Sequence, residues 1–390
     1  MKTKIVLFRN GDIYTPESIG RKDILVMNGE IVKIDNNIDI SGLKLDYDEF
    51  DATCYKILPG IIDQHVHIIG GGGEAGFASR IPEVKLSTLI AGGVTTVLGL
   101  LGTDGTTRDL KTLLAKSRSL TAHGITSYIL TGSYEIPTQT ITESVKSDII
   151  LLDHVIGVKI AMCDHRASYV TVNDLAKIAS DARTAGMIGN KAGIVTIHTG
   201  YGKEKLDVLF ETLEKTNIPI KHFIPTHVNR NQDILMDAVK FAKMGGFIDL
   251  TAVPSKDYLH DLTAGEAIRE SLACGVPLEH ITISSDGNGS WSKYDKKGHL
   301  THIGTSNPNN LYGEIKHMVI EMGFSITDAF KPVTSNVADV LHLNNHKGKI
   351  KEGYDADLLV LDNDMNIDSL MAMGHFLKRH KKHLKWEMFE

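Results

Sequence analysis

Eight short apolar runs, each followed by a stretch of different periodicity, dominate the middle of this 390-residue chain. The runs are rich in β-branched residues and predict strands at residues 58–68, 93–100, 125–133, 154–162, 193–200, 220–228, 245–253 and 281–288. Several intervening segments carry apolar residues at helical spacing and end in glycine: 107–124, 173–186 and 231–246. This eightfold alternation predicts an α/β fold, a (β/α)8 TIM-like barrel. A doubly wound open sheet is the second interpretation, although that fold has no reason to stop at eight strands.

The two ends of the chain show a different pattern. Residues 4–16 and 21–34 are short apolar runs that contain Asn-Gly pairs, and residues 348–365 repeat that style with short runs and turn residues. Asn-Gly between apolar runs is a hairpin signal. We therefore expect residues 1–56 and 343–390 to form one small β-sandwich domain, attached to a barrel domain of residues 57–342.

Composition narrows the class of protein. Hydrophobic residues make up 42% and charged residues 23% of the chain, as in soluble globular proteins. A net charge of −6 argues against nucleic acid or an anionic membrane as the main partner, and no run of apolar residues is long enough to span a bilayer. The three cysteines (Cys54, Cys163 and Cys274) lie far apart, and the N-terminal residues run into a strand-like segment without a signal sequence. We expect a cytoplasmic protein.

Polar residues of one kind gather at the ends of the predicted strands. His65 and His67 end the first run and point to the same side of a strand; the others are Lys159, His198, His227 and Asp286. Active sites of such barrels lie at the C-terminal ends of the strands. Each residue alone has an ordinary explanation, such as a hydrogen-bonded core histidine or a turn aspartate. Because they coincide at five strand ends, and because imidazole and carboxylate suit Zn²⁺ and similar ions, the sequence predicts a metal centre.

Lys159 needs an explanation of its own, because it lies between Val158 and Ile160 in a buried strand. An unpaired ammonium inside a barrel is costly. The lysine is therefore paired, neutralised or modified.

One glycine-rich segment imitates a different site. Residues 71–76 fit the G-x-G-x-x-G pattern of dinucleotide-binding folds and follow a predicted strand. The acidic residue that such a fold places at the end of the next strand is missing, since that strand ends in Gly99 and Leu100. We reject that interpretation. Histidines away from the predicted barrel mouth are given structural roles: His123, His154, His222, His260, His280, His302 and His317.

The set of strand-end residues resembles the amidohydrolase superfamily. Longer segments resemble one of its families, the isoaspartyl (β-aspartyl) dipeptidases, and cover nearly the whole chain: residues 62–76, 99–104, 130–137, 155–166, 225–231 and 283–290. The main departure follows the fifth strand, where the chain reads His198-Thr199-Gly200-Tyr201 and the family leads us to expect His-Met-Gly.

The resemblance implies two divalent metal ions, with Zn²⁺ expected. His65 and His67 would bind one ion together with Asp286, and His198 and His227 would bind the other. Lys159 would be N6-carboxylated, and its carbamate would bridge both ions.

The resemblance also implies an activity, hydrolysis of small isoaspartyl dipeptides by a hydroxide that bridges the metals. Asp286 would shuttle the proton, and Tyr134 together with a metal would stabilise the oxyanion. The implied substrate contacts are Glu74 to the α-ammonium, Arg166 and Arg230 to the carboxylates, and Thr103 and Ser290 assisting. From sequence alone these residues also fit surface ion pairs, packing or an exposed loop.

Two alternatives stay open. A cyclic-amide hydrolase of the dihydropyrimidinase type shares the metal ligands and differs only around Glu74, Tyr134 and the two arginines. A non-catalytic assembly protein on the same fold is the other, although such relatives lose metal ligands and this chain keeps them. The resemblance further implies a homo-oligomer, such as an octamer.

Overall fold

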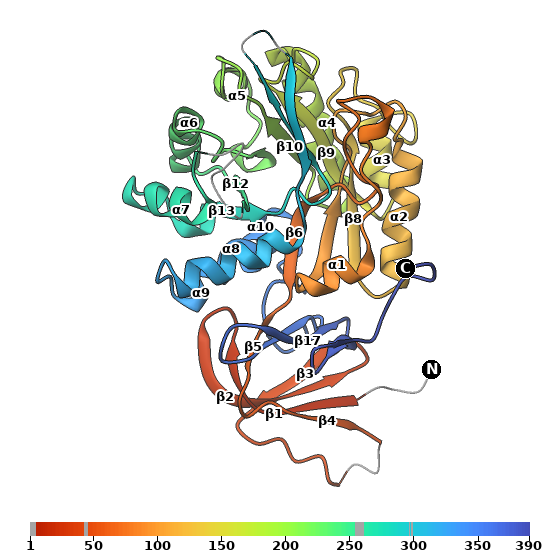
Figure 1. Cartoon of the computed structure of the whole chain (residues 1–390), viewed down its shortest axis with the longest axis vertical. Coiled ribbons are helices and arrows are strands. Elements are labelled where there is room, and N and C mark those ends of the chain that lie inside the picture. The colour runs from red at the N-terminus through yellow and green to blue at the C-terminus, as the bar shows by residue number, and fades with distance from the viewer. Residues whose placement is uncertain (1–4, 43–45, 254–260, 296, 298) are drawn as a thin grey trace.

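The computed structural model describes residues 5–42, 46–253, 261–295, 297 and 299–390. Its centre is a set of eight parallel strands in chain order: β6 (Ile61–Val66), β7 (Val94–Gly99), β8 (Thr126–Gly132), β9 (Val155–Met162), β10 (Ile194–Thr199), β11 (Phe223–Thr226), β12 (Ile248–Thr251) and β13 (Ile281–Ser284). A parallel bridge between Val66 and Gly287 closes the ring, and the His67 amide donates to the Gly287 carbonyl at 2.8 Å. The predicted (β/α)8 barrel is confirmed, and the open-sheet alternative is wrong (Figure 1).

The barrel strands are buried on both faces. Every residue of β6, β7, β9 and β10 is buried, as expected for parallel strands with side chains inside and helices outside. One apolar cluster joins strand residues such as Val158 and Ile197 to helix residues such as Leu113 and Ile178. This continuous packing makes the barrel a rigid support for side chains at its rim.

Helices surround the barrel (Figure 1). The longer ones are α2 (Leu110–Ala122), α4 (Val172–Gly189), α5 (Asp207–Lys215), α6 (Gln232–Lys243), α7 (Ala264–Ala273) and α8 (Asn309–Ile320). The shorter ones are α1 (Leu86–Ala91), α3 (Val145–Leu151), α9 (Ile326–Phe330) and α10 (Ser335–Val340). Single 3-10 turns are η1 (Phe77–Ser79), η2 (Ile220–His222), η3 (Leu278–His280) and η4 (Lys331–Val333).

Helix α4 corrects one sequence expectation. Its start is fixed by a capping box between Thr171 and Asp174, but it does not end at Gly186. The helix runs on until Asn190, which takes the left-handed conformation at φ 51°. Gly186 instead allows a close approach, since a Cβ there would lie 2.7 Å from the Cα of Gly193. This glycine serves packing and not termination.

Both chain ends build a second sheet of nine strands. The N-terminal part supplies β1 (Ile5–Tyr14), β2 (Ser18–Met27), β3 (Glu30–Asp35), β4 (Asp48–Asp51) and β5 (Lys56–Pro59), and the C-terminal part supplies β16 (Leu358–Leu361), β17 (Ile367–Ala372), β18 (His375–Arg379) and β19 (Lys382–His383). Strands β5 and β16 pair antiparallel and so join the two ends. The sheet has its own core, in which the centroid of the Phe8 ring lies 5.2 Å from that of Phe50 and 5.8 Å from that of Phe376. The expected small β domain from both ends is confirmed, while the boundaries 1–56, 57–342 and 343–390 stay our proposal.

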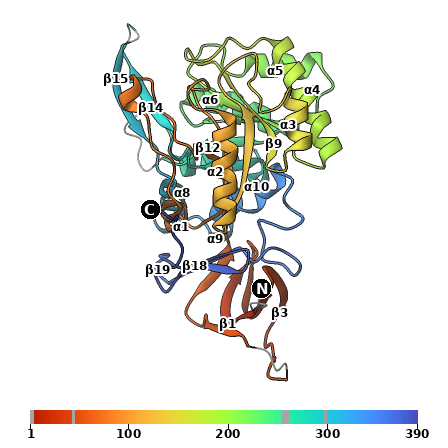
Figure 2. The same ribbon diagram turned by 90° about the vertical axis from the view of Figure 1, so that its right-hand side faces the viewer.

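A hairpin that the sequence did not predict leaves the barrel after β13. Strands β14 (Ser290–Tyr294) and β15 (Leu300–Thr305) pair antiparallel. The hairpin projects at the end of the barrel away from the small sheet (Figure 2). Among the helices in the described ranges, none is long and apolar enough to cross a membrane.

Candidate metal centre and substrate pocket

The six predicted ligand residues converge at the C-terminal mouth of the barrel. The amine of Lys159 lies 3.0 Å from Nε2 of His65. Oδ1 of Asp286 lies 3.5 Å from Nε2 of His65 and 3.2 Å from Nε2 of His67. The centroid of the His227 ring lies 4.7 Å from that of the His65 ring and 4.8 Å from that of the His198 ring. Residues from five strands therefore form one cluster.

Local backbone geometry turns two of these side chains inward. His227 and Asp286 directly follow strands and adopt left-handed conformations, with φ of 64° and 50°. Such conformations are uncommon for residues other than glycine and concentrate at functional sites. Nδ1 of His227 lies 2.7 Å from Oγ1 of Thr251, a contact that orients the ring and leaves Nε2 facing the cluster.

Burial sets the charge states at the cluster. Lys159 has no exposed surface, and burial lowers its pKa to about 7 despite the nearby charge of Asp286. Burial likewise lowers the pKa of His198 to about 3 and places the pKa values of His65 and His227 well below the usual range. Neutral imidazoles and an uncharged amine are the forms that bind metals or react with CO₂.

The donor atoms fit divalent ions. Three ring nitrogens (Nδ1 of His65, Nδ1 of His67 and Nε2 of His227) and Oδ1 of Asp286 are buried and have no hydrogen-bond partner. Buried polar atoms are otherwise almost always satisfied. Ligand atoms of His65, His67 and Asp286 all lie within 4.8 Å of one another and could hold a metal ion. A set of imidazole nitrogen and carboxylate oxygen suits Zn²⁺ and its neighbours.

A narrow recess beside the cluster is centred on Glu74. Its Oε1 accepts hydrogen bonds from Ser290 Oγ at 2.6 Å, from Thr103 Oγ1 at 3.3 Å and from an Nη of Arg166 at 3.3 Å. Oε2 of Glu74 is buried without a partner. Four of the predicted substrate residues thus contact one another, and one carboxylate oxygen remains open to a cationic ligand.

Asp164 belongs to the site, although the sequence analysis did not single it out. Its carboxylate receives two hydrogen bonds from the Arg166 guanidinium, at 2.9 and 2.7 Å, and one from Nε2 of His198 at 2.9 Å. Burial raises the pKa of Asp164, but the bonds from Arg166 and His198 outweigh it and keep the carboxylate ionised. The Tyr134 hydroxyl contacts the other nitrogen of the same ring, Nδ1 of His198. Asp164 therefore links a metal-ligand candidate to a substrate-binding candidate.

Two further carboxylates, also missed, tie the strands together beneath the cluster. Asp63 accepts from the Ser285 amide at 3.1 Å and from its hydroxyl at 2.5 Å, which fixes the chain just before Asp286. Burial raises the pKa of Asp63 to about 7 and also raises that of Asp249. Asp249 accepts hydrogen bonds from Gln64, Thr226, Thr282 and Ser284. An acidic residue inside an apolar run was the available signal for both.

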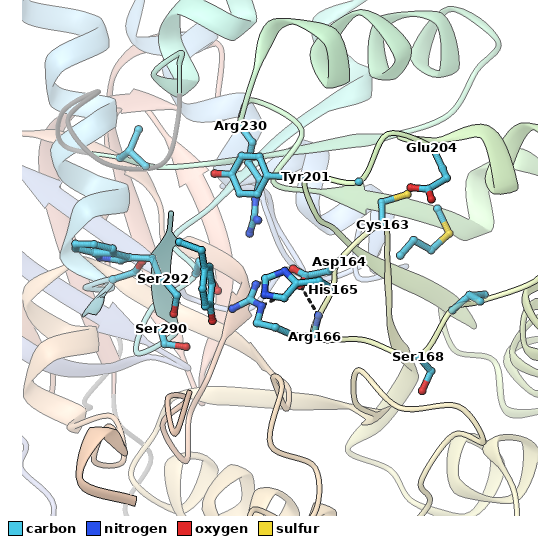
Figure 3. A pocket seen from close by; sticks show the side chains of 18 of the residues that line it. Cys163, Asp164, His165, Arg166, Ser168, Tyr201, Glu204, Arg230, Ser290 and Ser292 are labelled. Atoms are coloured by element: carbon cyan, nitrogen blue, oxygen red, sulfur yellow. Dashed lines mark hydrogen bonds and ion pairs between the residues drawn. The ribbon is translucent and has the colours of Figure 1, made fainter. Parts of the chain in front are cut away.

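A larger chamber of about 710 Å³ shares Asp286 with the cluster, and Figure 3 shows side chains that line it. Polar residues that line it include Arg166, Arg230, Asp286 and Ser290, and its apolar or aromatic lining residues are Met162, Tyr169, Val170, Tyr201, Val208, Trp291 and Tyr294. The Arg230 guanidinium stacks on the Tyr201 ring, 5.0 Å from its centroid. The hairpin β14–β15 contributes one side of this chamber.

The histidines set aside in the sequence analysis lie elsewhere. Nδ1 atoms of His123, His222 and His280 contact backbone carbonyls of nearby elements, and Nδ1 of His154 contacts Ser117 and Ser127. His302 lies on β15 and His317 on α8. His260 falls outside the described residues.

The fold and cluster define a class. A model of the amidohydrolase family matches residues 57–377, and the protein belongs to that family. Within it, the structure is similar to the beta-aspartyl dipeptidase of the thermophilic keratin-degrading Fervidobacterium islandicum AW-1, solved in complex with beta-Asp-Leu dipeptide. The two chains are 42% identical, 98% of each is covered, and the TM-score is 0.93. The resemblance inferred from the motifs is confirmed.

More distant relatives match this chain at lower sequence identity or over a shorter segment. The dihydropyrimidinase of Brevibacillus agri NCHU1002 superimposes with a TM-score of 0.67 over 98% of this chain and 96% of the other, at 16% identity, which shows a common fold alone. The dihydroorotase of Streptococcus pneumoniae serotype 4 is 32% identical over 119 residues, which are 30% of this chain and 26% of that protein. The chain thus matches about a quarter of the length of this curated relative.

Proposed function

We propose that this protein is a metal-dependent dipeptidase that hydrolyses β-aspartyl (isoaspartyl) dipeptides. The observation that carries the proposal is the position of the Glu74 recess directly beside the histidine cluster, with Arg166 and Arg230 close by. An isoaspartyl dipeptide carries one ammonium and two carboxylates around its scissile bond. One open carboxylate and two guanidinium groups around a metal-binding cluster complement that pattern. The similarity to a beta-aspartyl dipeptidase supports the same substrate class.

We assign the metal ligands as follows. His65, His67 and Asp286 would hold one divalent ion, and His198 and His227 would hold a second; Zn²⁺ is the ion expected. The uncharged Lys159 amine could add CO₂, forming an N–C bond and releasing one proton, and the resulting carbamate would supply anionic oxygen ligands for the ions. An anionic carbamate also removes the cost of a buried ammonium.

When bound, the two ions supply hydroxide at neutral pH and polarise the scissile carbonyl. Asp286 accepts the proton of the attacking water and delivers it to the leaving amine. Burial raises the pKa of Asp286, but the nearby His67 and His65 rings and the Lys159 amine outweigh that effect, so the group starts ionised. Tyr134 donates its hydroxyl proton to the carbonyl oxygen as negative charge develops there, and burial raises the pKa of Tyr134 so that this proton stays available.

The recess and the chamber bind the charged groups of the dipeptide. Oε2 of Glu74 binds the α-ammonium, while Thr103 and Ser290 hold the Glu74 carboxylate in place. Arg166 and Arg230 bind the two carboxylates of the dipeptide. Local cations at the site also explain how a protein of net charge −6 would attract an acidic substrate.

Hydrolysis of β-aspartyl-leucine and α-aspartyl-leucine by metal-analysed protein tests the proposal. We expect two metal ions per chain, cleavage of the β-linked peptide, and loss of cleavage after chelation. Cleavage of the α-linked peptide only, or of neither, would contradict the proposal.

A cyclic-amide hydrolase is the second candidate, because the partial sequence match to a dihydroorotase covers this kind of chemistry. Ring opening of dihydrouracil or hydantoin without cleavage of β-aspartyl-leucine would favour it. A non-catalytic assembly role is disfavoured by the complete ligand set. A homo-oligomeric state and a cytoplasmic location stay predictions.

A further inference from the structure

Arg230 is the starting point, because its charge has no counter-ion in the described part of the chain. The residue is 8% exposed, and its guanidinium makes no hydrogen bond or ion pair with any described residue. Its Nε is buried without a partner. Arg166, by contrast, is held by both Asp164 and Glu74. A nearly buried, unpaired guanidinium is costly unless a ligand pairs with it.

The position of Arg230 indicates which part of a ligand it meets. Arg166 lines both the inner recess around Glu74 and the outer chamber, whereas Arg230 lines only the outer chamber. If the substrate ammonium lies at Glu74 and the scissile bond at the metal cluster, the leaving residue extends into the outer chamber. Arg230 therefore faces the carboxylate of the leaving residue.

Tyr201 is the contact that fixes Arg230 in this orientation. The guanidinium lies over the Tyr201 ring at 5.0 Å from the centroid, and Figure 3 shows the two side chains against each other at the chamber edge. A guanidinium stacked on a ring keeps its N–H groups in the plane away from the ring face, free to bind a carboxylate. Tyr201 follows β10, two residues after Thr199, where the chain departs from the His-Met-Gly expected for its family.

We propose that Tyr201 is a positioning residue that acts through Arg230 and so selects dipeptides with a free carboxylate on the leaving residue. The proposal rests on the proposed function, and it assigns to Tyr201 a part of the specificity that the metal ligands do not supply. Its ring, and not its hydroxyl, carries the effect.

The experiment compares β-aspartyl-leucine with β-aspartyl-leucinamide, which lacks only the terminal carboxylate. For Tyr201→Leu we expect KM for the acid to rise about three- to fivefold while kcat changes little, because a cation–π contact at a half-exposed ring is lost. Tyr201→Phe keeps the ring and should stay within about twofold of wild type. On the amide, wild type and Tyr201→Leu should be alike. Tyr47→Leu, on the surface of the small domain, is the matched aromatic control.

Equal losses on acid and amide would overturn the proposal, as would a Tyr201→Phe variant as impaired as Tyr201→Leu. Calorimetric binding of both peptides to metal-loaded protein provides a readout without turnover. If wild type hydrolyses neither peptide but binds the acid more tightly than the amide, and loses that preference in Tyr201→Leu, the proposed reaction is wrong and the role of Tyr201 holds. If wild type hydrolyses both equally well, the proposed reaction holds and the role of Tyr201 is wrong.

Discussion

The amine of Lys159 lies 3.0 Å from Nε2 of His65, in a part of the barrel where Lys159 has no exposed surface. Burial lowers the pKa of Lys159 to about 7, so that much of the amine is uncharged at neutral pH. An uncharged amine among metal-ligand candidates can react with CO₂, whereas an ammonium there would repel a cation. This pair of residues therefore connects the packing of the barrel to its proposed chemistry.

Replacing this lysine removes the proposed bridge. We expect Lys159→Ala to lose at least one metal ion per chain, measured by elemental analysis after gel filtration. Short carboxylates such as acetate or propionate should restore part of the activity, because they can take the place of the carbamate. Lys221→Ala, an exposed lysine, is the control. Full metal occupancy in Lys159→Ala would refute the bridge.

The barrel and most of the cluster could be predicted from the sequence because the signals are local. A histidine at the end of an apolar strand has an ordinary explanation by itself, but the rule that barrel strand ends share one mouth brings several such residues together, as for His65 and His198. The second sheet was predictable for the same reason, since short apolar runs broken by turn residues occur at both chain ends; of the two Asn-Gly pairs, Asn28-Gly29 forms a hairpin turn, whereas Asn10-Gly11 lies at an irregularity within β1.

Other features depend on contacts between distant segments. Asp164 looks like any loop acid until the fold places it against both Arg166 and His198. The contact between Arg230 and the Tyr201 ring joins the loops that follow β10 and β11, and no periodic pattern in the sequence indicates it. Gly186 does not end its helix, contrary to the prediction. A glycine is required there because a Cβ would collide with the backbone of Gly193, a contact that the helix-end signals in the sequence do not indicate.

Asp286 is predicted to move protons as well as to bind metal. We expect Asp286→Asn to keep most of the metal, since the amide oxygen can still coordinate, and to lose about 10³-fold in kcat. Elemental analysis and steady-state kinetics on β-aspartyl-leucine check the two parts separately. Turnover near that of wild type would exclude the proton-transfer role.

Glu74 is predicted to read the substrate ammonium. Glu74→Gln should lower kcat/KM for β-aspartyl-leucine about ten- to a hundredfold, because a charge-assisted hydrogen bond is lost. N-succinyl-leucine differs from that substrate only by lacking the ammonium, and it provides the matched control. The variant and wild type should handle N-succinyl-leucine about equally. A similar loss on both substrates would mean that Glu74 serves the structure of the recess instead.

Lys347 is predicted to make stability depend on alkaline pH. It is 3% exposed, and its amine lies 2.8 Å from Asp355 and 2.7 Å from Asp357. Burial lowers its pKa, but the two carboxylates outweigh burial and raise the pKa above the usual value. A raised folded-state pKa contributes stability fully below the unfolded pKa of about 10.4, and that stability is lost as pH rises through the folded-state value.

Urea denaturation of Lys347→Met checks this prediction. At pH 8 we expect the free energy of unfolding to fall by about 3 kcal/mol, because the buried carboxylate of Asp357 and the partly buried carboxylate of Asp355 lose their partner. The difference from wild type should shrink above about pH 11, where wild type also loses the charge. Lys349→Met, an exposed lysine of the same segment, should match wild type at every pH. If the difference in the free energy of unfolding between Lys347→Met and wild type does not depend on pH, the destabilisation comes from packing and not from the lost charge.

Asp164 is predicted to strengthen metal binding at the second site through its hydrogen bond with the proposed ligand His198. Its carboxylate accepts from Nε2 of His198 at 2.9 Å, and such a bond fixes the tautomer of the imidazole and raises its basicity as a ligand. We expect Asp164→Asn to weaken binding of one of the two ions by about ten- to a hundredfold, measured by competition with a chelator. The ion at the other proposed site, which consists of His65, His67 and Asp286, should bind as in wild type. Asp233→Asn, an exposed acid at the start of α6, is the control. Equal weakening at both sites would show that Asp164 supports the barrel mouth as a whole, and unchanged binding at both would limit its role to orienting Arg166.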